Sequence, residues 1–196
     1  GGIEFDATMT TEFNTWQLHG VWHENNQGTA AKTLTLVASG LGISDVLGAL
    51  VDPSIAAGFS NSLSIIAEIP FTADGTPLES QMAVKVGRGQ IQFEPGHVAQ
   101  MQAAELNLRL LPDKNQIDLV RSNLRFDRTT AVLTGGLRYP ESPDDPISQQ
   151  PVFRLIAEEF DAFGLDTGTP GPKGKFLLEG VLDTKNQVIE MDRMVL

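Results

Sequence analysis

The sequence Asp166-Thr167-Gly168-Thr169 holds residue types that perform acid–base chemistry in aspartic proteases. In those enzymes two neighbouring carboxylates share one proton. That chemistry needs a second Asp-Thr-Gly loop or a homodimer, and a good deal of sheet after the loop. The chain has one copy of the Asp-Thr-Gly motif. Pro170-Gly171-Pro172 follows it, and few residues remain after that in the sequence. We therefore interpret the motif as a polar turn, and a hydrolase using Asp166 is the weakest of our hypotheses.

His19 and His23 are candidate metal ligands, because they lie on one face of a strand-like stretch and could reach one cation. A zinc site takes three or four ligands. The nearby Glu24 falls on the opposite face of that stretch. We therefore predict that both histidines face solvent, on the side of the strand opposite Trp16, Leu18 and Trp22, and that they form no metal site.

The remaining motifs carry no recognisable chemistry. Gly87-Arg88-Gly89 lacks the third glycine and the following helix of a dinucleotide loop, and no serine sits in a Gly-x-Ser-x-Gly elbow. The acidic residues Glu141, Asp144 and Asp145 do not match the spacing of a calcium loop. Without cysteines there is neither a disulfide nor a thiolate metal site. We predict a chain that is not an enzyme, with no catalytic residue, no cofactor and no metal.

The elements that would hold any site are strands, because apolar and polar residues alternate along most of the chain. Turn residues (Gly, Pro, Asn and Asp) separate the alternating runs. Such a pattern predicts an antiparallel meander with one buried and one wet face. The runs cover residues 3–9, 16–22, 33–38, 63–69, 82–86, 91–93, 106–110, 117–119, 124–126, 131–137, 176–182 and a last strand around Val188.

Three segments depart from this alternation. Residues 44–51 have a serine cap and an apolar stripe at helical spacing, and predict a short helix ended by Asp52-Pro53. Residues 140–151 are rich in proline and acid and predict a flexible loop. Residues 153–163 fit a helix about as well as a strand, and we take them as a strand. The fold class is mainly β: a curved antiparallel sheet, either an open groove or sandwich-like, with one short helix between strands. Residues 1–196 form a single domain.

A weak repeat of the form Leu-x-Gly-x-apolar occurs at Leu18, Leu133 and Leu178. Glycine inside a strand marks a bend or a close approach of backbone. Three such positions would curve the sheet, although chance recurrence of common residues also explains the pattern.

Net charge limits the partners. At −11 the chain is a poor ligand for nucleic acid and for anionic headgroups, so any contact with lipid must be apolar. No run approaches the roughly 18 apolar residues of a spanning helix. Both ends of the chain read as strand, and we expect a fragment of a longer protein.

Several runs together resemble the AsmA-like proteins of Gram-negative bacteria. They are LNLRLLPDKNQIDL from Leu106, SNLRFD from Ser122, LTGGL from Leu133, GQIQF from Gly89 and ISDVLGAL from Ile43. The resemblance is one of pattern, spread over residues 3–138 and 153–196. It implies a periplasmic β-groove, anchored to the inner membrane in the full-length protein, that takes part in phospholipid transport or outer-membrane maintenance.

The implied partners are lipid acyl chains, and contact with a membrane would be made by regions of the parent protein outside this sequence. The family supplies no catalytic residue to carry over. The alternative is a structural or interaction module of an envelope or secreted protein, whose apolar face is closed as an ordinary core. The residues expected to line a groove are Phe5, Ala7, Leu63, Ile65, Ala67, Leu106, Leu108, Leu110, Phe126, Phe176 and Leu178.

Overall fold

The computed structural model describes residues 2–10, 14–25, 29–44, 60–94, 97–126, 129–140, 150–163, 170–183 and 188–195. These form twelve strands and one short 3₁₀ turn, η1 (Pro112–Lys114). The strands are β1 (Gly2–Thr10), β2 (Thr15–Glu24), β3 (Lys32–Gly42), β4 (Ser62–Phe71), β5 (Ser80–Val86), β6 (Gly89–Glu94), β7 (His97–Leu111), β8 (Gln116–Phe126), β9 (Thr129–Arg138), β10 (Val152–Phe163), β11 (Pro170–Asp183) and β12 (Val188–Val195).

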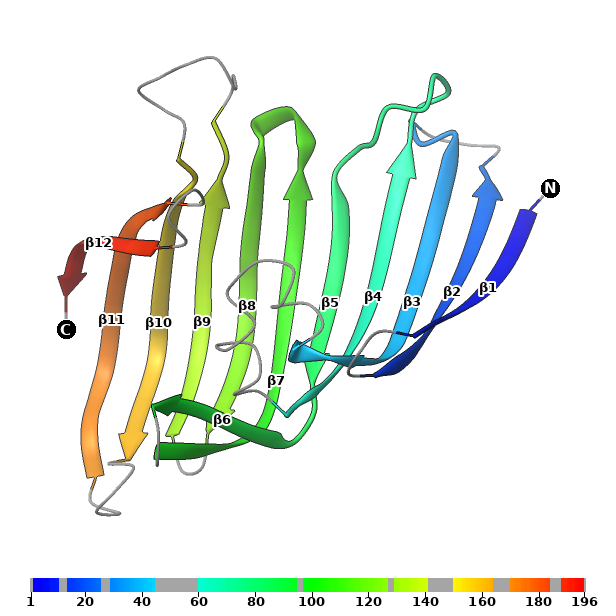
Figure 1. Cartoon of the computed structure of the whole chain (residues 1–196). Coiled ribbons are helices and arrows are strands. Elements are labelled where there is room, and N and C mark those ends of the chain that lie inside the picture. The colour runs from blue at the N-terminus through cyan, green and yellow to red at the C-terminus, as the bar shows by residue number, and fades with distance from the viewer. Residues whose placement is uncertain are drawn as a thin grey trace.

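All twelve strands belong to one antiparallel sheet that follows the chain order, except that β6 pairs with β7 alone. Figure 1 shows an open, curved sheet with β1 at one end and β11 and β12 at the other. The prediction of a mainly β, curved antiparallel meander is confirmed. The predicted helix at residues 44–51 lies outside the described residues except for its first position, and so does most of the loop predicted at 140–151.

Each described strand packs against its neighbours in the sheet, and no second layer of described elements covers either face. The most buried apolar side chains gather towards the end of the sheet where β5 leads into β6. One cluster is formed by Ala38, Leu41, Leu63, Val86, Met101 and Ala104. A second, smaller cluster is formed by Ala131, Leu133 and Ala157.

Bulges keep apolar side chains on one face where the alternation of the sequence changes phase. In β3 the pairing with β4 shifts between Ser39 and Leu41, and Gly40 takes a φ of 78°. A one-residue insertion of this kind, with glycine in the left-handed region, is a standard bulge. In β8 one extra residue lies between Leu119 and Ser122 relative to both β7 and β9. Leu119 and Ser122 therefore share a face despite their odd spacing.

The bulge in β10 explains why residues 153–163 were ambiguous in the sequence. The register of β10 shifts just after Ala157 against both β9 and β11. The apolar positions of this strand are two residues apart until the bulge and three residues apart across it, as in a helix. They are Phe153, Leu155, Ala157 and Phe160. The strand prediction is confirmed, and the helix-like step is the bulge.

Ser122 completes the hydrogen bonding of the β8 bulge. Its side chain is fully buried. The Ser122 hydroxyl accepts the Asn107 N–H at 2.9 Å and donates to the Val120 carbonyl at 2.8 Å. The hydroxyl thereby serves two backbone groups that the interrupted ladder would leave without partners.

Replacing Ser122 with Ala should lower the free energy of unfolding by about 1–3 kcal/mol, because two part-buried backbone groups lose their hydrogen-bond partner. Urea denaturation measures the change. Ser64→Ala, on the opposite face of β4, is the matched control and should stay within about 0.5 kcal/mol of wild type. Equal effects of the two substitutions would contradict this role of Ser122.

The glycines of the Leu-x-Gly repeat lie where another group occupies the space of a side chain. A Cβ at Gly20 would overlap the ring of Phe5, its cross-strand partner. At Gly135 it would overlap the Arg154 carbonyl oxygen, and at Gly180 the Glu190 carbonyl oxygen. The predicted close approach of backbone is confirmed at Gly135 and Gly180.

Gly135→Ala should destabilise the fold by about 1–3 kcal/mol, since the new methyl group meets backbone that must shift. The adjacent Gly136→Ala is the control, because its Cβ would meet the Ile117 carbonyl oxygen at 3.3 Å and needs only a small adjustment. Thermal and urea unfolding of the two variants compare them directly. A Gly136→Ala variant that is the less stable of the two would refute the interpretation.

Candidate functional site: the apolar face of the sheet

One face of the sheet carries an uninterrupted apolar row that crosses eleven strands. We call it the central row, and each member is the register partner of the next. The central row consists of Phe5, Gly20, Leu36, Ala67, Met82, Leu108, Leu119, Gly135, Leu155, Leu178 and Met194. With strands about 4.8 Å apart, its ten steps span about 48 Å. That length exceeds the roughly 30 Å hydrocarbon thickness of a bilayer.

The central row keeps part of its apolar surface exposed in the described structure. Phe5 is 40% exposed and Met194 is 59% exposed, at the two ends of the row. Most of the members between them are half-buried, whereas Gly20 and Ala67 are buried. A sheet face closed by a packed layer would bury such side chains fully. Among the described residues, no packed layer therefore closes this face, and part of its apolar surface stays accessible.

Two buried serines on this face have hydrogen-bond partners. Ser80 is buried, and its hydroxyl donates to the Leu78 carbonyl at 2.9 Å. Ser122 is engaged by its own bulge, as described above. Charged side chains of this face appear at one end, where Glu24 pairs in register with Lys32. The Lys32 ammonium lies 6.0 Å from the ring centre of Trp22. The face is thus apolar in its interior and polar at that rim.

The opposite face is charged, and its row beside the central row is mostly ionic. This charged row consists of Glu4, Val21, Thr35, Glu68, Gln81, Arg109, Asp118, Gly136, Arg154, Glu179 and Arg193. Cross-strand partners of opposite charge bind one another along it: Arg154 Nε lies 3.0 Å from Glu179 Oε1, and Arg193 Nη1 lies 4.0 Å from Glu179 Oε2. These pairs fit the rule that opposite charges stabilise facing positions in a sheet.

Arg109 and Asp118 form the shortest ion pair of the charged row among the described residues. Arg109 Nη2 donates to Asp118 Oδ2 at 2.7 Å, and Glu79 Oε1 lies 3.7 Å from Arg109 Nη1. The hydrogen bond from Arg109 lowers the pKa of the Asp118 carboxyl below its usual value, although partial burial acts in the opposite direction.

Asp118→Asn should lower stability at neutral pH but not in strong acid. A carboxyl whose pKa is lower in the folded state stabilises the fold above its unfolded pKa of about 3.9, and that contribution disappears as pH falls through the folded pKa. The stability difference between wild type and variant should therefore be constant above about pH 5 and shrink below about pH 4. Urea unfolding across this range measures it. A stability difference between wild type and variant that grows as the pH falls would contradict this role of the Asp118 carboxylate.

Among the described residues, two shallow hollows can be placed on the charged face. One, of about 560 Å³, is lined by residues that include Lys85, Glu105 and Arg125. The other, of about 520 Å³, is lined by residues that include Glu68 and Arg109. Each hollow mixes acidic and basic side chains, so neither favours one class of ligand.

The structure places all the groove residues predicted from the sequence on the apolar face. Phe5, Ala67, Leu108 and Leu178 belong to the central row itself. The row beside it contains Ala7, Leu18, Ala38, Ile65, Val84 and Leu106. Register also assigns Leu63, Leu110, Phe126 and Phe176 to this face. The Asp166 motif lies outside the described residues.

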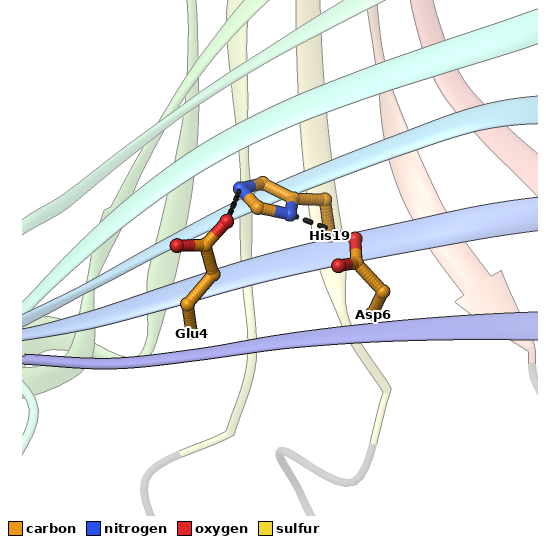
Figure 2. A group of neighbouring side chains, drawn as sticks. All are labelled: Glu4, Asp6 and His19. Atoms are coloured by element: carbon orange, nitrogen blue, oxygen red, sulfur yellow. Dashed lines mark hydrogen bonds and ion pairs between the residues drawn. The ribbon is translucent and has the colours of Figure 1, made fainter.

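A cluster of three possible metal ligands lies on the charged face at the edge of the sheet. Figure 2 shows the imidazole of His19, on β2, between the carboxylates of Glu4 and Asp6, on β1. His19 Nδ1 lies 2.9 Å from Asp6 Oδ1, and His19 Nε2 lies 3.9 Å from Glu4 Oε1. Spacing within one strand does not reveal these two acids, and we did not predict them as partners of His19. The signal in the sequence is the acid–x–acid spacing of Glu4 and Asp6 on a strand that precedes the histidine.

No protein-family model, curated protein or solved structure matches this chain. Among the described residues, no helix is long and apolar enough to cross a membrane. The function is therefore inferred from the two faces of the sheet.

Proposed function

We propose that the apolar face binds lipid acyl chains and that the chain is a non-catalytic, lipid-carrying segment of an AsmA-like envelope protein. The observation that carries this proposal is the central row, which crosses eleven strands without a polar side chain. An acyl chain has no hydrogen-bonding groups, so apolar surface of this kind is sufficient to bind it.

The energetics of such binding are adequate. Each methylene removed from water contributes about 0.8 kcal/mol, so ten buried methylenes contribute about 8 kcal/mol before the entropy of association is subtracted. The central row, about 48 Å long, could bind a few acyl chains by apolar contact alone, without charged side chains that bind the headgroup.

Charge supports apolar binding over headgroup recognition. The net charge of −11 repels anionic headgroups, and the charged groups described on the apolar face are confined to the rim at Glu24 and Lys32. Headgroups would remain in water at the rim. The resemblance to AsmA-like proteins extends the proposal to the periplasm, an inner-membrane anchor in the parent protein, and phospholipid transport or outer-membrane maintenance.

Native mass spectrometry of the purified chain tests the proposal. We expect phospholipid to copurify, and delipidated protein to take up a fluorescent fatty acid. A lipid-free chain that takes up no fatty acid would instead favour the alternative, an interaction module whose apolar face is covered by another protein segment.

Two adjacent isoleucines of β4 make a matched pair of variants. Ile65 lies on the apolar face, and Ile66 is 48% exposed on the charged face. Ile65→Gln should weaken fatty-acid uptake about tenfold or more. The bound acyl chain would cover the new amide without giving it a hydrogen-bond partner, which costs about 1–3 kcal/mol. Ile66→Gln should leave uptake unchanged.

Circular dichroism and thermal melting show whether each of these variants is folded. Phe5→Gln, at the exposed end of the central row, repeats the test at a position where unfolding is less of a concern. Equal uptake by all three variants and wild type would refute binding at the apolar face.

A further inference from the structure

We propose that Glu4, Asp6 and His19 bind one divalent transition-metal cation, with Zn²⁺ as the best fit. The proposed site lies on the charged face and is independent of lipid binding on the other face. The three residues come from the edge strand β1 and its neighbour β2.

The backbone register positions the three ligands. Asp6 and His19 are direct cross-strand partners, and Glu4 is two residues from Asp6 on the same face. One ligand atom from each residue lies within 4.8 Å of the other two. Zinc binds nitrogen and carboxylate oxygen at about 2.0–2.2 Å. Asp6 faces His19 Nδ1 at 2.9 Å and Glu4 faces His19 Nε2 at 3.9 Å, so one ion would bind a single ring nitrogen. The Glu4 and Asp6 side chains, 69% and 79% exposed, would turn toward that nitrogen to complete the set.

The donor types select the kind of cation. An imidazole nitrogen with two carboxylates suits zinc and its neighbours in the first transition row, whereas calcium takes six to eight oxygens. Three protein ligands leave one position of a tetrahedral zinc ion for water. The geometry thus points to an accessible ion rather than a closed structural site.

Local charge also favours a cation. Glu4 and Asp6 place two carboxylates side by side on an edge strand of a chain whose net charge is −11. Their ion pairs within the described part of the structure are with His19, whose side chain is 39% exposed. An ion bound there would link β1 to β2, and binding to the folded state alone would raise the unfolding temperature.

Isothermal titration of the tag-free whole chain with ZnCl₂ tests the proposal. We expect one saturable site, and a rise in unfolding temperature at saturation. His19→Ala, Asp6→Asn and Glu4→Gln should each weaken binding at least about tenfold and reduce the thermal shift. Calcium should not compete at equal concentration.

Two controls make the result specific. His23→Ala removes a histidine on the same strand and face, and Glu68→Gln removes one negative charge elsewhere on the charged face. Both should bind zinc as wild type does. The proposal is overturned if wild type shows no saturable binding, if His19→Ala binds as tightly as wild type, or if His23→Ala loses the site. Circular dichroism establishes that each variant is folded. Folding should be retained, because the substituted side chains are at least partly exposed.

Discussion

The in-register pairing of antiparallel strands is the constraint on which the rest of this structure depends. Side chains alternate between faces with a period of two, so a slip of one residue in any strand would move its apolar set to the charged face. Here the register is kept through eleven successive strands, and the central row and the charged row are neighbouring lines of the same ladder. One backbone arrangement therefore produces both an apolar surface and an ionic one.

Bulges and glycines maintain that arrangement where the sequence would disturb it. The extra residues near Gly40, in β8 and after Ala157 reset the phase of alternation, and Ser122 replaces the hydrogen bonds that the β8 bulge interrupts. Gly135 and Gly180 allow neighbouring backbone to approach more closely than a side chain would permit. Because the described strands pack only within the sheet, stability depends on these ladders and on the clustered apolar side chains towards the β6 end.

Much of the fold could be predicted from the sequence because alternation is a local signal. The strand runs, the antiparallel meander and the shared face of Phe5, Leu63 and Leu106 all follow from it. Residues 153–163 were ambiguous because a bulge imitates a helical step. The cluster of Glu4, Asp6 and His19 was missed because cross-strand register, rather than spacing within one strand, brings it together. The change from odd to even apolar positions between Leu119 and Leu124 marks the β8 bulge in the sequence itself, although we predicted no bulge there.

Methyl NMR of the chain with a nitroxide-labelled fatty acid tests most directly whether acyl chains lie on the apolar face, because the label broadens nearby methyl signals. If they do, the signals of Leu36, Leu108 and Leu155 on the central row should broaden, while those of Ile66 and Val120 on the charged face stay sharp. Broadening of Ile66 and Val120 with sparing of the central row, or no broadening at saturating ligand, would contradict acyl-chain binding at this face.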